Sequence, residues 1–541
     1  MSVTQRPPMP SFIPESAPFT MEQRTWLNGL FAGLFGLEEG ITPLSSEDVA
    51  RLLPGFIDGG ALPSTDVDDG APWHDPAMAI ADRMKLAEGR PLPRRMMAAM
   101  AQQDCGQCGY NCHDYSQAIF AKKEERLNLC VPGGKDTARM LKQLYGEIDR
   151  APASTVDAVR VANKSETPGP TPGRSRESPV YATFLSRKLL NKPGSQKETW
   201  HIEFDLSEAG LDYAVGDSLG IFPGNDPALV EAVISALDAP PDFPIGGRIL
   251  REVLTDGVSL SPAPDMLFQL LSYLTGGERR QKAKALAAGM DPDGDAAVLD
   301  VLAALQKFPG VRPDPEAFIE SLDALQPRVY SISSSLKCNP GKVSLTVDAV
   351  RYEVEKRTRL GVASTFLAGR VSPGDKIKVY VQKAQHFALP ADPKTPIIMV
   401  GPGTGVAPFR AFLHERQATR APGRNWLFFG HQRSNYDFFY EDELVAMRAA
   451  GLLTRLTLAW SRDANEKIYV QHRMREVGRD LWAWLTEGAH FYICGDAVRM
   501  AKDVERTLVD VIAEHGMRTP AEAVNFLAEL RKLGRYQTDV Y

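Results

Sequence analysis

A short apolar segment, PIIMV at residues 396–400, runs directly into the glycine-rich segment GPGTGVAPFRAFLHER at 401–416. Glycines in a turn that opens a helix let backbone N–H groups approach a pyrophosphate, and the helix N-terminus adds a partial positive charge. Gly403 and Thr404 are the candidate contacts in this turn. Because the turn lies between a strand and a helix, it is a stronger nucleotide-binding candidate than an isolated glycine loop.

Three more short apolar segments follow, each separated from the next by a helical pattern. Strands that alternate with helices predict a parallel, doubly wound α/β sheet, and such a sheet is expected to bind a dinucleotide. The segments are NWLFFG at 425–430, LTRLTLAW at 453–460 and HFYICGD at 490–496.

The segment SRDANEKIYVQ at 461–471 follows the third of these strands and bears on the choice of dinucleotide. A site for NAD normally offers a carboxylate to the ribose 2′-hydroxyl at this point. Ser461, Arg462, Lys467 and Tyr469 suit a 2′-phosphate better, because charge-assisted hydrogen bonds to phosphate are strong. We therefore expect NADPH, while by composition alone the segment also fits a solvated surface loop.

Strand-like alternation begins at residue 181 and is interrupted by a largely helical block at about 226–320. The pattern predicts an antiparallel β-barrel with an α-helical insertion. Within it, RVYSISSS at 328–335 places Arg328 where it can hold a phosphate and Tyr330 where it can stack on a flavin. Each feature alone also fits ordinary strand chemistry.

The composition limits the class of protein and its partners. The chain has 541 residues, 43% hydrophobic and 24% charged, as expected of a multidomain globular protein. Sixty-two Lys and Arg against 68 Asp and Glu give a net charge of -6, so neither nucleic acid nor an anionic membrane is an expected partner. The N-terminus has no secretory signal pattern, and WLNGLFAGLFGL at 26–37 is shorter than the ~20 residues of a membrane span. We expect a cytoplasmic protein.

Five segments are predicted along the chain, from the changes in periodicity and in Pro, Ser and Gly content. They are a helical or irregular adaptor at 1–80, a small mostly α-helical module at 81–150, a flexible linker at 151–177, the barrel domain at 178–390 and the dinucleotide domain at 391–541.

Four of the six cysteines lie within the predicted module, at Cys105, Cys108, Cys112 and Cys130. In a reducing compartment such clustering indicates a metal or redox site rather than disulfides. The spacing C-x2-C-x3-C-x17-C lets the first three thiols ligate one cluster, while a helix and a Pro-Gly-Gly turn bring back the fourth, so a metal cluster held by four thiolates is expected. The alternatives are a four-thiolate zinc site, which usually has two separated C-x2-C pairs, and a site in which His113 replaces one thiolate.

Several motifs together resemble the flavoprotein subunits of NADPH sulfite reductases, within the diflavin and ferredoxin-NADP reductase family. The resemblance runs from about residue 178 to 541. Its motifs are RVYSISSS, LGVASTFLAGRV, GPGTGVAPFRAFLHER, NWLFFG, AWSRDANEKIYVQ, FYICGDAVRMAKDVE and RYQTDVY.

The resemblance implies a set of cofactor contacts. For FAD they are Arg328, Val329, Tyr330, Ser331, Thr346, Val347, Asp348, Tyr352, Gly361, Val362, Ala363 and Ser364. For NADPH they are Ser461, Arg462, Lys467, Ile468, Tyr469, Val470, Gln471 and Asp503.

The same resemblance implies the residues of hydride transfer. Ser331 is expected near flavin N5, Cys494 beside the nicotinamide, and Asp539 where positive charge develops. Tyr541 is expected to cover the flavin ring and to move before the nicotinamide stacks.

The chain departs from the family ahead of the FAD domain. Residues 1–177 lack the phosphate loop and the strands of an FMN-binding flavodoxin. The cysteine segment instead resembles a small [4Fe-4S] domain whose sequence reads CGxCG and later CxPGG. This chain has one residue fewer than that pattern between the second and third cysteines. We expect electrons to pass from NADPH to FAD, then to the cluster, and on to a sirohaem sulfite reductase hemoprotein. The alternatives are another acceptor, such as a nitrite reductase, a ferredoxin or an oxygenase, and a zinc docking module at the N-terminus.

Overall fold

The computed structural model describes residues 73–74, 78–103, 108, 110–148, 171–354, 357–384 and 386–541. Most of the predicted adaptor, Cys105 and most of the predicted linker therefore lie outside the described residues. The stretch Pro72–Tyr541 forms one compact unit. No helix of the described ranges is long and apolar enough to cross a bilayer.

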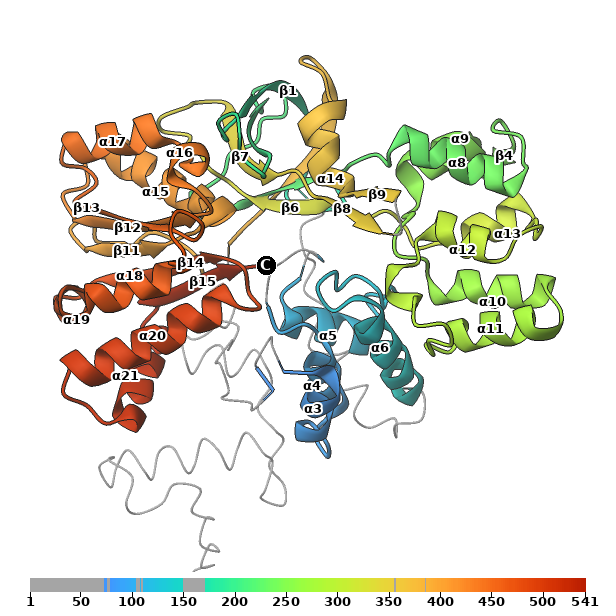
Figure 1. Ribbon diagram of the computed structural model, residues 1–541, viewed down its shortest axis with the longest axis horizontal. Helices are drawn as coiled ribbons and strands as arrows, with labels where there is room; N and C mark the ends of the chain where they lie inside the picture. The colour runs from blue at the N-terminus through green and yellow to red at the C-terminus, as the bar shows by residue number, and fades with distance from the viewer. Residues whose placement is uncertain are drawn as a thin grey trace, which may run out of the picture. The chain divides into compact units, whose positions relative to one another are not determined.

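A six-stranded antiparallel sheet forms the barrel (Figure 1). Its edge strands meet at an antiparallel bridge between Ile332 and Leu345, next to a Ser333 N–H to Ser344 carbonyl bond of 2.8 Å. Phe184 and Phe204 pack edge to face inside it, with ring centroids 5.6 Å apart. In sheet order the strands are β6 (Arg328–Ser331), β3 (Ser218–Ile221), β10 (Lys376–Gln382), β1 (Val180–Leu189), β2 (Thr199–Asp205) and β7 (Lys342–Asp348).

The helical insertion lies between β3 and β6 and has its own apolar core, which includes Leu267, Phe268 and Phe318. Aspartates start three of its helices, because their carboxylates accept the free N–H groups of the first turn. The elements are α8 (Pro227–Leu237), β4 (Pro244–Ile245), β5 (Arg248–Ile249), α9 (Leu250–Glu252), the π-helical η1 (Val253–Gly257), α10 (Asp265–Leu274), α11 (Gly277–Ala287), the 3₁₀ turn η2 (Ala296–Val298), α12 (Val301–Lys307) and α13 (Pro315–Glu320).

A hairpin and a short helix complete the barrel domain. The hairpin is β8 (Arg351–Val354) and β9 (Arg357–Leu360), and it leads into α14 (Val362–Thr365) and the π-helical η3 (Phe366–Arg370).

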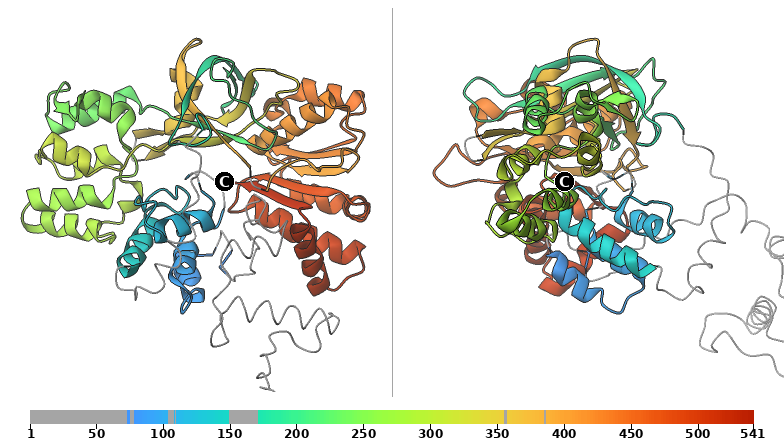
Figure 2. Two further views of the ribbon diagram at one scale, coloured as in Figure 1. Left: turned by 180° about the vertical axis from the view of Figure 1, so that it is seen from behind. Right: turned by 90° about the vertical axis from the view of Figure 1, so that its right-hand side faces the viewer.

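The C-terminal domain is a five-stranded parallel sheet with helices on both faces, seen in Figure 1 and from behind in Figure 2. Its strand order is β13-β12-β11-β14-β15. The chain adds strands on one side of β11 (Ile397–Val400) and then on the other, and ligands bind such sheets at this reversal point. The other strands are β12 (Asn425–His431), β13 (Arg455–Trp460), β14 (His490–Gly495) and β15 (Tyr536–Val540).

The helices of this domain divide between two cores. One face packs under α15 (Ala407–Ala418) and α17 (Glu441–Ala449), around Phe409, Phe412 and Leu444. The other packs under α18 (Val470–Glu476), α19 (Gly478–Thr486), α20 (Met500–His515) and α21 (Pro520–Lys532). Two shorter elements are η4 (Gly403–Val406) and α16 (Ser434–Asp437).

The cysteine-bearing module, described over residues 78–103, 108 and 110–148, contains four helices in these ranges. Methionines and leucines of its helices pack around Tyr115 and Ile119. Asn111 caps the helix that begins at Cys112, because its side chain accepts the Asp114 N–H at 2.6 Å. The helices are α3 (Ile80–Leu86), α4 (Leu92–Ala99), α5 (Cys112–Phe120) and α6 (Gly134–Ile148).

Candidate functional site

Three predicted catalytic residues meet where the barrel touches the parallel sheet. Ser331, the last residue of β6, donates to Asp539 Oδ2 at 2.5 Å. Cys494 pairs with Asp539 in the parallel register of β14 and β15, and its Sγ donates to the same oxygen at 3.7 Å. The carboxylate therefore joins residues that are far apart in the sequence.

Burial controls the protonation of this group. It raises the pKa of Asp539, and the hydrogen bonds from Ser331 and Cys494 oppose that rise. Burial also raises the pKa of the Cys494 thiol well above its ordinary value, with the Asp539 charge acting in the same direction. The thiol therefore stays protonated, and the carboxylate is the group that can stabilise a neighbouring positive charge.

The glycine-rich turn lies at the carboxyl end of β11, as predicted. A Cβ at Gly405 would lie 2.1 Å from the Cys494 carbonyl oxygen, so only glycine lets the turn pack on the end of β14. Gly403 has a φ of +59° in the region that favours glycine. The turn leads into α15, whose twelve residues give it a full helix N-terminus next to the reversal point.

The C-terminal tyrosine closes over this turn. The Tyr541 hydroxyl and Thr404 Oγ1 share a hydrogen bond of 2.7 Å, and the Tyr541 N–H donates to the Gly495 carbonyl at 3.0 Å. Its side chain is nevertheless 46% exposed. The movement of Tyr541 on dinucleotide binding, expected from the resemblance, stays a prediction.

The predicted 2′-phosphate residues lie on one exposed segment after β13. The Ser461 and Arg462 N–H groups donate to the carbonyls of His431 and Gln432 at 2.9 and 2.8 Å. Arg462, Lys467 and Tyr469 are exposed. Two cations and hydroxyl donors on an open loop fit a phosphate group.

Four other residues of this predicted set have internal partners instead. Val470 is buried in the core, and Ile468 packs against that core. The Gln471 amide donates to Asp503 Oδ2 at 3.3 Å, while Asp503 also pairs with Arg506 at 2.8 Å.

The predicted flavin strand, β6, is an edge strand with all four side chains partly exposed. Arg328 Nη1 donates to the carbonyls of Gln326 and Pro327 at 2.9 and 3.3 Å, and no carboxylate of the described ranges forms an ion pair with it. Burial lowers the pKa of Arg328 and raises that of the Tyr330 hydroxyl. A partly buried cation without a carboxylate partner fits a phosphate ligand, so the strand suits FAD.

The second predicted FAD segment is a tight turn before α14. A Cβ at Gly361 would lie 2.6 Å from Ser364 Oγ and 2.8 Å from Val350 Cβ, so glycine is required. Ser364 Oγ accepts the Val350 N–H at 3.1 Å, while Ala363 is buried and Val362 is partly exposed.

The remaining predicted FAD residues lie at the end of β7 and on the hairpin. Val347 is buried in the barrel core, and Thr346 bonds the Tyr440 hydroxyl at 2.7 Å. Asp348 accepts from Thr199 Oγ1 at 3.0 Å, and Tyr352 is 52% exposed on the hairpin. The Tyr440 partner has no sequence signal, because it comes from the other domain.

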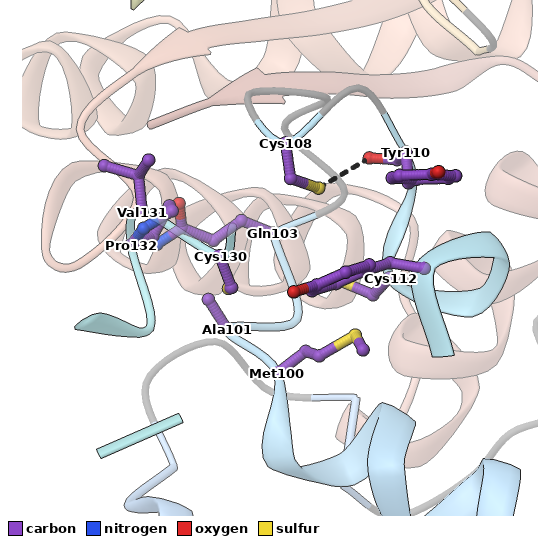
Figure 3. Close-up of a pocket in the computed structure, with 10 residues that line it drawn as sticks. Met100, Ala101, Gln103, Cys108, Tyr110, Cys112, Cys130, Val131 and Pro132 are labelled. Atoms are coloured by element: carbon purple, nitrogen blue, oxygen red, sulfur yellow. Dashed lines mark hydrogen bonds between the residues drawn. The ribbon is translucent and has the colours of Figure 1, made fainter. Parts of the chain in front are cut away.

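Three of the four clustered cysteines line one pocket, which Figure 3 shows. Cys108 and Cys130 are each 8% exposed, and the Cys108 thiol donates to the Tyr110 carbonyl at 3.3 Å. Burial raises the pKa of Cys108 to about 11 and also raises that of Cys130. The rest of the lining is Met100, Ala101, Gln103, Tyr110, Cys112, Tyr115, Val131 and Pro132.

This donor set fits a thiolate-held cluster better than a carboxylate-bound metal, because the lining contains no acidic side chain. Among the described residues no three His, Cys, Asp or Glu side chains are arranged to hold a metal ion, and Cys105 lies outside them.

Arg176 connects this module to the segment just before the predicted flavin strand, although it belongs to the predicted linker. Its side chain is only 7% exposed. Nη1 donates to the Cys108 carbonyl at 3.2 Å, and Nη2 donates to Gln326, two residues before Arg328. The composition of the linker gave no signal for this contact.

Comparison with known proteins assigns two domains. Residues 399–506 match the family model of the oxidoreductase NAD-binding domain, and residues 172–246 and 247–366 match that of the FAD binding domain. The fold and the site together define a flavoprotein oxidoreductase that binds FAD and NADPH.

The chain is similar over most of its length to proteins named sulfite reductase (NADPH) flavoprotein alpha-component. It is 39% identical over 464 residues to that of Escherichia coli K12, covering 78% of this chain and 75% of the relative. It is 43% identical over 371 residues to that of Photorhabdus laumondii and 44% over 374 to that of Klebsiella pneumoniae, covering 68% of this chain and 61% of each relative. The chain therefore belongs to the family of sulfite reductase flavoprotein alpha-components.

Proposed function

We propose that the chain is the NADPH-oxidising component of a cytoplasmic sulfite reductase, and that electrons leave it through a [4Fe-4S] cluster. The observation that carries the reductase part is the hydrogen-bonded group of Ser331, Cys494 and Asp539 at the junction of the two cofactor-binding domains. The family membership supports the same assignment.

FAD, when bound, accepts a hydride from NADPH, and a [4Fe-4S] cluster exchanges single electrons. Arg462 and Lys467 would hold the 2′-phosphate and Arg328 the FAD phosphates. The Asp539 carboxylate would stabilise the positive charge that grows as NADPH gives up its hydride. Ser331 orients that carboxylate through its hydrogen bond of 2.5 Å. Tyr541 would leave Thr404 when the dinucleotide binds, which breaks their hydrogen bond of 2.7 Å.

The cluster assignment rests on Cys105, Cys108, Cys112 and Cys130. Its support is the thiol pocket of Figure 3, in which described cysteines from two separate segments line one apolar space. A hydride carries two electrons, whereas a haem acceptor takes electrons singly. Residues 1–177 lack the sequence pattern of a flavodoxin domain, which would otherwise convert the two-electron step into single-electron steps. The cluster would supply that conversion.

The proposed partner is a sirohaem sulfite reductase hemoprotein, because relatives of this chain are named as an alpha-component of sulfite reductase. A nitrite reductase, a ferredoxin or an oxygenase is the alternative acceptor. Measuring which of these proteins the chain reduces with NADPH separates the alternatives.

The test replaces all four cysteines by Ser and follows two activities with NADPH. Reduction of the sirohaem partner should be lost, while ferricyanide reduction, which needs only FAD, should be retained. Equal loss of both activities contradicts the relay. Retention of both would show that electrons leave directly from FAD.

Metal and sulfide analysis of anaerobically purified protein separates the cluster from zinc. About four iron and four labile sulfide per chain are expected for one [4Fe-4S] cluster. Zinc without labile sulfide would support the docking-module alternative and would overturn the cluster.

A further inference from the structure

The turn between β1 and β2, residues 190–198, belongs to the barrel but packs on the parallel-sheet domain. The Lys192 N–H donates to the Tyr436 carbonyl at 2.8 Å. Gly194 has a φ of +102°, and a Cβ there would lie 2.9 Å from the Tyr436 ring. The turn is therefore shaped to fit this contact closely.

A buried carboxylate anchors the turn. Asp437, at the end of α16, is 1% exposed. It accepts from Asn191 Nδ2 at 2.8 Å, from Ser195 Oγ at 2.5 Å and from the Arg433 N–H at 3.0 Å. Two of these donors come from the barrel, so a single buried charge ties the two domains together.

The anchored segment also supports the proposed 2′-phosphate loop. His431 lies 3.3 Å from Asp437, and its carbonyl accepts both the N–H of Ser461 at 2.9 Å and its hydroxyl at 3.3 Å. At the tip of the turn, Gln196 Oε1 accepts from Arg462 Nη1. The barrel thus directly contacts Arg462, the arginine proposed to hold the 2′-phosphate.

The other end of the turn reaches the predicted FAD residues. Lys197 forms an ion pair with Asp348 at 3.2 Å, and Thr199 donates to the same carboxylate at 3.0 Å. One short turn therefore contacts a predicted residue of each cofactor site.

We propose that Gln196 is a positioning residue that selects for a 2′-phosphorylated dinucleotide by holding Arg462 in place. An exposed arginine has many rotamers, and fixing it before binding lowers the entropy cost of forming its hydrogen bonds with phosphate. Asn191 and Ser195 affect Arg462 indirectly, because they anchor the turn that carries Gln196 on Asp437. This inference rests on the proposed placement of the 2′-phosphate at Arg462.

The experiment measures binding of adenosine 2′,5′-bisphosphate and of 5′-AMP to the full-length protein by calorimetry, with KM and kcat for NADPH and NADH in parallel. Gln196→Ala should weaken binding of the bisphosphate about fivefold and leave 5′-AMP binding unchanged. Gln196→Glu should weaken it more, because a carboxylate would stand beside the phosphate. Asn191→Ala should act like Gln196→Ala, and KM for NADPH should rise while kcat is retained.

Lys192→Gln is the matched control, since Lys192 lies on the same turn and pairs with Glu441 at 2.6 Å, away from Arg462. Wild-type selectivity in both Gln196 variants and in Asn191→Ala overturns the positioning role. Arg462→Ala separates this result from a failure of the proposed site: if that variant also keeps the preference for the 2′-phosphate, the placement of NADPH itself is wrong.

Discussion

The two cofactor-binding domains and the cysteine-bearing module present their candidate residues in different ways. In the domains, Ser331, Cys494 and Asp539 all lie on strands: the register of β14 and β15 pairs Cys494 with Asp539, and the contact between the two sheets brings Ser331 to the same carboxylate. In the module, Cys112 starts a helix and Cys108 and Cys130 lie in connecting segments, so no ladder of backbone bonds fixes their spacing. A site on strands is assembled by the fold itself, whereas a site on loops depends more on what it binds.

The first prediction tests the assembled site. Asp539→Asn should lower kcat for NADPH-dependent ferricyanide reduction about 100-fold, because the amide cannot stabilise positive charge. FAD content should be unchanged, as measured by the flavin absorbance. Because burial raises the pKa of Asp539, the wild-type rate should fall on the acid side as this group becomes protonated, and that limb should vanish in the variant. A variant with the wild-type rate would show that the Asp539 carboxylate takes no part in hydride transfer.

The second prediction concerns the join between the two domains. Burial would raise the pKa of Glu443, but hydrogen bonds from His414 and Arg410 and the charge of Arg410 outweigh it and lower that pKa to about 2. Arg410 also donates to the Ser333 carbonyl of the barrel at 2.8 Å. Glu443→Gln should therefore destabilise the protein by about 2 kcal/mol at pH 7.

Urea unfolding of the holoprotein as a function of pH measures this effect. A carboxyl group whose pKa is lower in the folded than in the unfolded protein stabilises the fold fully when the pH is above its unfolded-state pKa. It loses that contribution as the pH falls toward its folded-state pKa. The difference between wild type and variant should shrink below about pH 5. A pH-independent difference would indicate lost packing rather than lost charge.

The same contrast explains how much the sequence could predict. The order of strands and helices around residue 401 indicated the parallel sheet, and the structure has this sheet, because local periodicity and a glycine turn determine it. Ser331 and Asp539 could be paired only through the family resemblance, since they are 208 residues apart. The sequence did not predict the hydrogen bond between Thr346 and Tyr440 or the one from Arg176 to Cys108. Contacts between domains leave no periodic pattern in either segment.

The third prediction tests whether packing fixes a cysteine in the module. A Cβ at Gly133 would lie 2.2 Å from Thr137 Oγ1 and 2.9 Å from Cys130 Sγ. Gly133→Ala should displace Cys130 and lower the iron content at least twofold, with FAD content unchanged, at a cost of about 1–3 kcal/mol. Gly146→Ala is the matched control in α6, because a Cβ there meets nothing within 4 Å. If both variants keep full iron content, the module tolerates movement of this ligand and differs from the strand-built site even more than proposed.

The last and smallest effect is expected at the movable end of the strand-built site. Thr404→Val removes the hydrogen bond to the Tyr541 hydroxyl and keeps the backbone of the turn, so NADPH no longer has to break that bond. A neutral hydrogen bond contributes about 1 kcal/mol, so KM for NADPH should fall about threefold to fivefold. Tyr541→Phe removes the same bond from the other side and should have the same effect, and the double variant should add nothing further. Additive effects would mean that the two hydroxyls act independently. The hydrogen bond between Tyr541 and Thr404 would then not hold the C-terminal residue on the dinucleotide turn.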